Sequence, residues 1–305
     1  MEYHIIAILG TSGKDSKSIY SKDDSLDSLP LKNGEFHNST HCLMESFGES
    51  ATYTFIGTSE SITYQNEIFD TLPQCKAIFE KFSPQILRDS SEIEAIFHQI
   101  IESIKNTKSQ NIILDITHGF RSQPIIASFA SVLAQISTKK SITLLFAKTQ
   151  GKDSQERDLF QYTSLERYSQ ISLIALCLQT FTQTLRVPKV DSLDKNKYPF
   201  IDTLTRFSNA LHANAFAQIF GLLNEAKNEL QKIKKGTRFK GLENILEDVN
   251  NVLSKFTKIQ QIKEKHKQYY EISLLMNEKG YYLIAITYIR EAILLYVLDS
   301  ISVNL

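Results

Sequence analysis

The chain has 305 residues, of which 42% are hydrophobic and 22% charged, and its 34 basic and 34 acidic side chains leave no formal net charge. A chain without net charge has no global field that would draw it to nucleic acid or to an acidic membrane surface. Because single hydrophobic cores stop growing near this length, we expect two domains.

Cysteine usage and apolar segments indicate a protein of the cytoplasm. Cys42, Cys75 and Cys177 are far apart and odd in number, so they form neither a disulfide framework nor a metal-ligand pattern, and we expect no metal. The N-terminal apolar run lacks the basic region of a signal peptide. The apolar segment 281–298 carries Arg290 and Glu291 at its centre, which favours a buried helix over a membrane span.

The first half of the chain alternates two kinds of pattern. Short continuous apolar runs predict buried strands at 4–10, 51–57, 111–116 and 141–148. Apolar residues at helical spacing lie between them, as at 91–105 and 123–137. This alternation predicts an α/β domain in which helices cover both sides of a parallel sheet.

The second half of the chain is predicted to be helical. Helical periodicity runs over 157–185, 201–234, 241–272 and 281–300. A stretch with two prolines and mixed charges, 187–199, connects the first two of these. We therefore expect an α/β domain over residues 1–156 and an all-α domain over residues 157–305.

Three of the predicted strands end in small polar residues. These are Gly10, Thr11, Ser12, Gly13 and Lys14 after the first strand, Gly57, Thr58 and Ser59 after the second, and Asp115, Thr117, His118 and Gly119 after the third. In parallel sheets ligands bind at the carboxyl ends of strands, and exposed amides and hydroxyls there suit phosphate or ribose. The first cluster lacks the Walker spacing, which excludes ATP hydrolysis of that kind, and by itself it is equally typical of a flexible turn.

The segment DITHGFRSQP at 115–124 is the most specific pattern. Gly119 permits a sharp turn close to a ligand, and Arg121 can pair with a phosphate through two parallel hydrogen bonds. Asp115 can hold a hydroxyl or orient His118, and Thr117 and His118 can donate to phosphate. The alternative is structural: Asp115 caps the next helix and His118 is an ordinary loop histidine.

LDITHGFRSQP resembles the DxTHG motif of CRISPR-associated effectors that join a CARF (CRISPR-associated Rossmann-like) domain to a helical HEPN domain. The resemblance implies a Rossmann-like sensor domain and a homodimer that binds cyclic oligoadenylate, usually the tetramer, in type III CRISPR antiviral defence. The ligand would be an activator, and no cofactor is implied. The matching positions here are Gly10 to Lys14, Thr58, Ser59 and Thr117 to Arg121.

The same resemblance implies a metal-independent ribonuclease that acts on single-stranded RNA through an Arg-x4–6-His pair. The candidates here are Arg206 and His212, separated by five residues. His212 would activate the RNA 2′-hydroxyl and Arg206 would stabilise charge on the phosphorus. On a helix, however, these two residues point about 120° apart. The alternative is an amphipathic helix with a surface histidine.

Other functions remain open. The segment 282–298 resembles the helix that precedes the catalytic one in relatives, so a chain ending at Leu305 would be a sensor without its nuclease site. A second alternative is a ring nuclease, in which Thr11, Ser12, Thr117 or His118 positions the messenger for its own cleavage. A third is a binding module without catalysis. A metabolic nucleotide enzyme is disfavoured because no Gly-x-Gly-x-x-Gly follows the first strand.

A basic stretch in the second half could line an RNA path. It contains Lys227, Lys232, Lys234, Lys235, Arg238 and Lys240. Glu225, Glu229 and Glu243 are interspersed, so a solvated helix face is the favoured interpretation.

Overall fold

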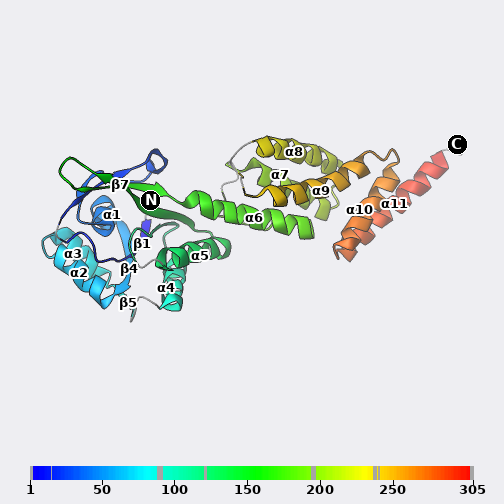
Figure 1. Cartoon of the computed structure of the whole chain (residues 1–305). Helices are drawn as coiled ribbons and strands as arrows, with labels where there is room; N and C mark the ends of the chain where they lie inside the picture. The colour runs from blue at the N-terminus through cyan, green and yellow to red at the C-terminus, as the bar shows by residue number, and fades with distance from the viewer. Residues whose placement is uncertain are drawn as a thin grey trace. The chain divides into compact units, whose positions relative to one another are not determined.

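The computed structural model describes residues 3–14, 16–87, 92–119, 122–193, 197–235, 239 and 241–302. It divides into two compact units (Figure 1). The first comprises Met1–Gln170 with Val190–Ser192, and the second comprises Ile171–Lys189 with Leu193–Leu305. The first unit is α/β and the second is helical, as the sequence predicts.

The first unit is built on a mixed sheet with the strand order β3-β2-β8-β7-β6-β1-β4-β5 among the described residues. The strands are β1 Tyr3–Ile8, β2 Ser18–Lys22, β3 Gly34–Phe36, β4 Ala51–Thr58, β5 Gln85–Leu87, β6 Asn111–Asp115, β7 Ser141–Lys152 and β8 Asp158–Ser164. The pairs β7–β8 and β2–β3 are antiparallel and the other neighbours are parallel. The sheet is therefore Rossmann-like and mainly parallel, with antiparallel pairs at one side.

Both faces of the sheet are covered because side chains alternate along each strand. On β1, Ile5 and Ala7 join the core under α1 Ser39–Phe47, α2 Ser59–Phe69 and α3 Pro73–Lys81, whereas Ile6 and Ile8 face α4 Ile93–Asn106 and α5 Ser122–Ser137 (Figure 1). Short 3₁₀ turns lie at Asp24–Leu26 and Gly48–Ser50. The four predicted strands are confirmed as β1, β4, β6 and β7.

The prediction of helix from residue 157 is wrong for β8. Its first residues form a hairpin with β7, and Leu145 pairs with Ser164 at the far end of the ladder. The Asp153 carboxylate closes the hairpin by accepting the Arg157 backbone N–H at 2.9 Å and its Nε–H at 2.8 Å. Tyr162 is fully buried. The first unit therefore continues past the expected boundary at 156 to Gln170.

The second unit consists of helices. After α6 Glu166–Thr184, which begins in the first unit, these are α7 Pro199–His212, α8 Phe216–Lys235, α9 Glu243–Gln260, α10 Lys265–Glu278 and α11 Tyr282–Ser302. Phe207 packs between Phe181 and Phe256, with ring centroids 6.2 and 5.1 Å away. The predicted helix 201–234 is two helices, because Asn214 adopts a positive φ of 52° that ends α7.

The last helix, α11, differs from the buried helix that we expected. Of the α11 residues whose burial the structure describes, 282–301, only Ala285, Tyr288 and Ala292 are buried, and Leu283 is 79% exposed. Tyr288 fastens α11 to α7 by donating to the Leu211 carbonyl at 2.8 Å. None of the helices in the described part of the chain is both long and apolar enough to cross a membrane.

Candidate functional site

The three polar clusters predicted from the sequence follow three strands that are neighbours in the sheet. Strand β1 lies between β6 and β4, with Ala7 opposite Asp115 and Ile8 opposite Ile56. In the sheet, β4 and β5 lie on one side of β1, whereas β6 and β7, which follow them in the chain, lie on the other side. This change of direction is the point at which open α/β sheets bind ligands. Arg121, the predicted phosphate contact, lies outside the described residues.

Asp115 lies beneath this edge of the sheet and is completely buried. Its Oδ1 accepts the Thr117 backbone N–H at 3.0 Å and the Thr117 hydroxyl at 2.5 Å, and its Oδ2 accepts the Ser39 hydroxyl at 2.7 Å. The carboxylate therefore holds hydroxyls, but they belong to the protein itself. Asp115 therefore fixes the motif loop at Thr117 and the start of α1 at Ser39.

His118 lies where three loops meet. Its Nε2 accepts the Ser39 backbone N–H at 3.3 Å, so the neutral ring carries its proton on Nδ1, which lies 3.4 Å from Ser12 Oγ. Burial lowers the pKa of His118, and the Asp115 carboxylate partly opposes this shift. The ring is therefore neutral near pH 7, and its Nδ1–H can donate to Ser12 or to a ligand.

The loop from Gly10 to Gly13 passes close to His118 and His37. A Cβ added at Gly10 would lie 2.9 Å from His118 Cβ. Gly13 has a φ of +89°, and a Cβ there would lie 1.7 Å from the His37 carbonyl oxygen. Glycine is thus required at Gly13 by both conformation and space.

The carbonyl groups of this loop point into the protein. The Gly10 carbonyl accepts from Gln65 Nε2 at 2.8 Å, and the Ser12 carbonyl accepts from Asn38 Nδ2 at 3.2 Å. The Gly13 carbonyl accepts from His37 Nδ1 at 2.7 Å. No described residue accepts a hydrogen bond from the backbone amides of Thr11, Ser12 or Gly13. Such a run of available N–H groups forms a concavity that suits an anion.

The end of β4 contributes Thr58 and Ser59. The Thr58 side chain caps α2 by accepting the Ser61 backbone N–H at 3.3 Å, and Ser59 is exposed. Gly57 is closely packed, since a Cβ there would lie 2.4 Å from Ser61 Oγ. Lys14 pairs with Glu67, and its backbone N–H donates to the Tyr64 hydroxyl at 2.9 Å.

Four residues at this edge were not predicted from the sequence: His37, Asn38, Ser39 and Gln65. His37 and Asn38 precede α1 and Ser39 is its first residue, and Asn38 accepts the His41 backbone N–H at 3.0 Å as the N-cap. Asparagine followed by two hydroxyl residues is a recognisable start of a helix, so His37-Asn38-Ser39-Thr40 could have located this loop. The sequence holds no local signal that would have identified Gln65.

Arg206 and His212, the predicted catalytic pair, both lie on α7, but Arg206 contacts α8 whereas His212 contacts the connection between α10 and α11. Arg206 forms ion pairs with Asp202 at 3.2 Å and with Glu225 of α8. It lines a groove of about 600 Å³ between α7 and α8 that His212 does not line. The His212 ring packs edge-on against Tyr281, with centroids 4.7 Å apart, and its Nδ1–H donates to the Ser208 carbonyl at 2.8 Å.

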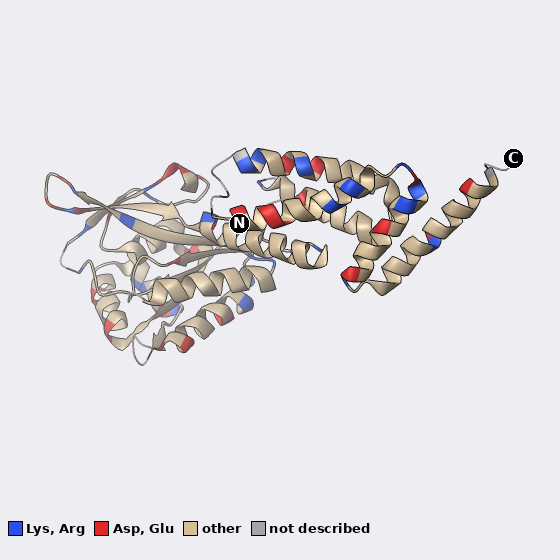
Figure 2. Ribbon diagram, turned by 45° about the vertical axis from the view of Figure 1, so that its right-hand side comes forward, with Lys and Arg blue, Asp and Glu red and all other residues tan. Residues whose placement is uncertain are grey.

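The basic residues of α8 are paired with neighbours. Both blue and red residues occur along α8 and α9 (Figure 2). Lys232 lies 2.7 Å from Glu229, and Lys234 lies 2.6 Å from Glu247. This arrangement favours the solvated face over an RNA path. Arg238, Lys240 and the side chain of Lys235 lie outside what the structure describes.

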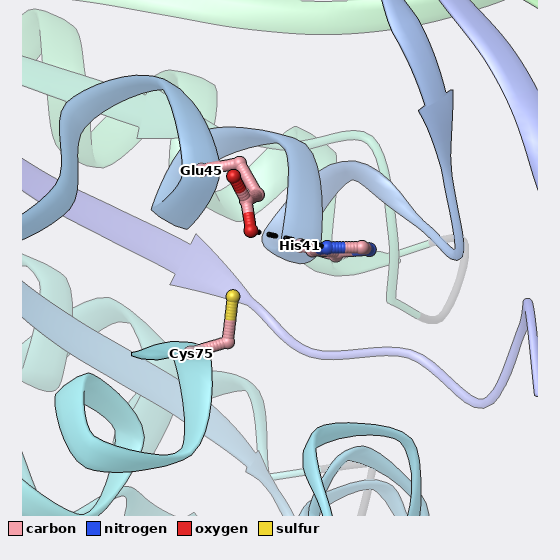
Figure 3. A group of neighbouring side chains, drawn as sticks. All are labelled: His41, Glu45 and Cys75. Carbon is pink, nitrogen blue, oxygen red and sulfur yellow. Dashed lines mark ion pairs between the residues drawn. The ribbon is translucent and has the colours of Figure 1, made fainter. Parts of the chain in front are cut away.

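One group of side chains has the composition of a metal site. His41 and Glu45 project from α1 and Cys75 from α3, with their ligand atoms within 4.8 Å of one another (Figure 3). A cavity of about 440 Å³ is lined by Glu45 and Cys75.

The hydrogen bonding of this group does not suit a metal. His41 Nδ1 accepts the His37 backbone N–H at 3.1 Å, so the neutral ring carries its proton on Nε2, the atom that faces Glu45. A metal-bound histidine instead donates from its second nitrogen. Burial also raises the pKa of the Cys75 thiol to about 12. As arranged, the three side chains are a buried polar contact.

Comparison with known protein families finds a match for the first unit. Residues 5–151 match the family described as CRISPR system endoribonuclease Csx1, CARF domain. The match includes every predicted ligand-binding residue and neither Arg206 nor His212. No curated protein matches the chain. The resemblance to CARF-containing CRISPR proteins is thereby confirmed for the first unit, whereas the HEPN assignment stays a prediction.

Proposed function

We propose that this chain, whose first unit is a CARF domain, is a receptor for cyclic oligoadenylate in type III CRISPR defence. The observation that carries the proposal is the loop Gly10–Gly13 at the switch point of the sheet. Its carbonyls are held inward and its amides are available to an anion. Cyclic tetra-adenylate is the ligand that we propose, because it is the ring that the resemblance to CARF effectors implies, and the first strand is not followed by a dinucleotide fingerprint.

The charge distribution agrees with a site of this kind. The chain has no net charge, so attraction to the messenger must come from local donors. The loop amides, the Ser12 hydroxyl, His118 and Ser59 supply such donors around one edge of the sheet. We assign Arg121 to a phosphate contact with them, as its place in the motif implies.

We further propose that two copies of the chain pair through α5. Ile125, Phe129, Leu133 and Ile136 are spaced so that they share one face of α5, and we call this face the α5 stripe. Their side chains are 59%, 69%, 50% and 43% exposed. A contiguous apolar stripe on a surface helix marks an interaction site. A second copy would place two equivalent loops around a cyclic ligand that has a two-fold axis.

Calorimetric titration of the full chain with cyclic tetra-adenylate tests the receptor. We expect saturable binding with one ring bound per two chains, and much weaker binding of a linear tetra-adenylate of the same charge. Cyclic hexa-adenylate serves to compare ring sizes. If neither ring binds, the first unit is not a receptor for these messengers.

A ring nuclease is a second candidate, and the contact between His118 and Ser12 favours it. A neutral imidazole and a hydroxyl 3.4 Å apart could position a ribose 2′-hydroxyl for attack on the adjacent phosphate. The Thr117 hydroxyl is engaged by Asp115 and Ala147, so it serves the loop instead. Chromatography of the messenger after incubation decides the point: linear products that disappear in His118→Ala identify a ring nuclease, and an intact ring excludes it.

Ribonuclease output is the further activity that the family implies, and Arg206 and His212 are its candidates. Cleavage of labelled RNA that requires messenger and is lost in both Arg206→Ala and His212→Ala would establish it. Lys232→Ala, which also removes a paired cation of the second unit, is the matched control. Intact RNA would leave the chain as a sensor that acts through a partner. The three free, buried cysteines suit the reducing cytoplasm in which such a system would work.

A further inference from the structure

Three side chains from the interior hold the carbonyl groups of the Gly10–Gly13 loop. They are His37, Asn38 and Gln65, and we call them the loop clamp. Each donates one hydrogen bond to a different carbonyl, of Gly13, Ser12 and Gly10 respectively. Asn38 and Gln65 are completely buried.

The clamp residues are also joined to one another. Asn38 Nδ2 donates to Gln65 Oε1 at 3.0 Å as well as to the Ser12 carbonyl, while Asn38 Oδ1 caps α1. Both hydrogens of the Asn38 amide and its oxygen are therefore used. Buried networks of this kind are rigid when every member is satisfied, because no member can move without leaving a buried polar atom unpaired.

We propose that Asn38 and Gln65, assisted by His37, are positioning residues that aim the amides of the Gly10–Gly13 loop at a phosphodiester of the bound messenger. The inference deepens the proposed receptor function and rests on it. None of the three touches the ligand in this account. They act through the loop.

The physical reason lies in the polarity of the peptide groups. A loop of small residues with a glycine can present either carbonyl oxygens or amide hydrogens to one side, because each peptide plane can turn. Carbonyl oxygens facing the site would repel a phosphate, whereas amide hydrogens attract it. Gln65 and Asn38 take up the carbonyls of Gly10 and Ser12, so they fix the peptide groups that carry the Thr11 and Gly13 amides before the ligand arrives. His37 fixes the next peptide group through the Gly13 carbonyl, and the amide of that group, on Lys14, donates to Tyr64. Binding then does not have to order the loop.

The clamp also connects two of the strand ends. Gln65 belongs to α2, whose first turn follows Thr58, and it holds Gly10 at the end of β1. Asn38 belongs to the loop that meets His118 through Ser39. The relative position of the three ligand-binding loops thus depends on two buried amides.

Gln65→Met tests the proposal, because methionine has nearly the same shape and cannot donate. Asn38→Ser is the second variant, since serine keeps the helix cap but is too short to reach Ser12. Gln135→Met is the matched control: Gln135 is equally buried in the same unit, and its side-chain Nε2 bonds to no described residue. We expect both clamp variants to bind cyclic tetra-adenylate at least about tenfold more weakly, which is about 1.4 kcal/mol, and Gln135→Met to bind like the wild type.

Hydrogen exchange of the 9–14 segment separates positioning from general destabilisation. We expect the messenger to slow exchange in this segment in the wild type and in Gln135→Met, and to slow it much less in the clamp variants at saturating ligand. If Gln65→Met does not fold, Asn38→Ser carries the test alone. Wild-type affinity with wild-type protection in the clamp variants would overturn the inference while the receptor stands. Failure of the wild type to bind either ring would overturn the receptor, and the inference with it.

Discussion

The Thr117 hydroxyl donates to the buried Asp115 carboxylate at 2.5 Å and accepts the backbone N–H of Ala147 at 2.9 Å. Asp115 ends β6 and Ala147 lies in β7, so this single hydroxyl joins the motif loop to the neighbouring strand. Since Asp115 also holds Ser39, the aspartate and threonine of the motif fix the loops of the site from below. His118 and the Gly10–Gly13 loop are the parts of the proposed site that would face a ligand.

Thr117→Val should destabilise the first unit. It keeps the shape of the side chain but leaves the Ala147 N–H and one hydrogen-bonding position of Asp115 unsatisfied, which costs on the order of 1–3 kcal/mol. Thr117→Ser, which retains the hydroxyl, should cost less than half as much. Urea unfolding of the two variants measures the difference. Equal midpoints would mean that the hydroxyl does not hold the loop.

Gly13→Ala should impair the loop more than the fold. Alanine at a φ of +89° is strained by roughly 1–2 kcal/mol, and its Cβ would collide with the His37 carbonyl oxygen. We expect affinity for cyclic tetra-adenylate to fall at least about tenfold. Gly151→Ala is the control, because Gly151 also has a positive φ, of +112°, but a Cβ there meets open space. A similar loss in both variants would attribute the effect to backbone strain alone.

The strands that meet at the candidate site were predictable because their signals are local. Continuous apolar runs identified these strands, and small polar residues follow their carboxyl ends, which stay the predicted ligand-binding edge. The residues in the interior of the site could not be predicted in the same way. Gln65 is one polar residue on an amphipathic helix, and only the packing of α2 against β1 shows that it reaches Gly10. Asp115 was expected to face a ligand or His118, and its burial became evident only from the fold.

Stability of the first unit should decline as the pH falls from about 6.5 toward 4. Burial, with a smaller contribution from Lys140, lowers the pKa of His4 to about 4, and burial followed by His37 lowers that of His41 to about 4. As the pH falls, the unfolded chain therefore binds these protons before the folded chain does. The free energy of unfolding is highest above pH 6.5 and decreases as the pH approaches the folded-state pKa values. Each histidine contributes on the order of 2–4 kcal/mol.

Urea unfolding at several pH values between 7 and 4 checks this prediction. His4→Gln should flatten the decline relative to the wild type, because the titrating group is gone. His98→Gln, at an exposed position, is the control and should leave the profile unchanged. A decline that is equally steep in His4→Gln would show that other groups cause it.

Phe129→Glu should separate the two copies of the proposed dimer. Phe129 is 69% exposed at the middle of the α5 stripe, so the folded chain tolerates the change, but the two-fold axis would bring two buried glutamates together at a cost of several kcal/mol. Sedimentation should show a monomer where the wild type is a dimer. Ile86→Glu alters a similarly exposed residue on β5, at 62%, and should remain dimeric. An unchanged Phe129→Glu dimer would place the interface elsewhere.

The second unit was less predictable than the first. Helical periodicity gave its class, but the break after His212 has neither glycine nor proline and depends on Asn214. The strand β8 was mistaken for helix because Phe160 and Leu165 were taken as the start of a helical series. Phe160 and Tyr162 instead have the two-residue spacing of one face of a strand, and this segment pairs with β7. The Arg-x5-His spacing on α7 singled out Arg206 and His212, whereas in the structure Arg206 pairs with Glu225 of α8 and His212 packs against Tyr281 between α10 and α11.

Titration of the purified full chain with cyclic tetra-adenylate, with labelled RNA present and the messenger analysed afterwards, tests the central claim most directly. We predict that cyclic tetra-adenylate binds saturably at one ring per two chains, and that its affinity is at least about tenfold weaker in Gln65→Met and unchanged in Gln135→Met. The fate of the RNA and of the messenger then identifies the output. Absence of binding by both the tetramer and the hexamer, with the chain folded, would contradict the claim that this domain is a cyclic oligoadenylate receptor.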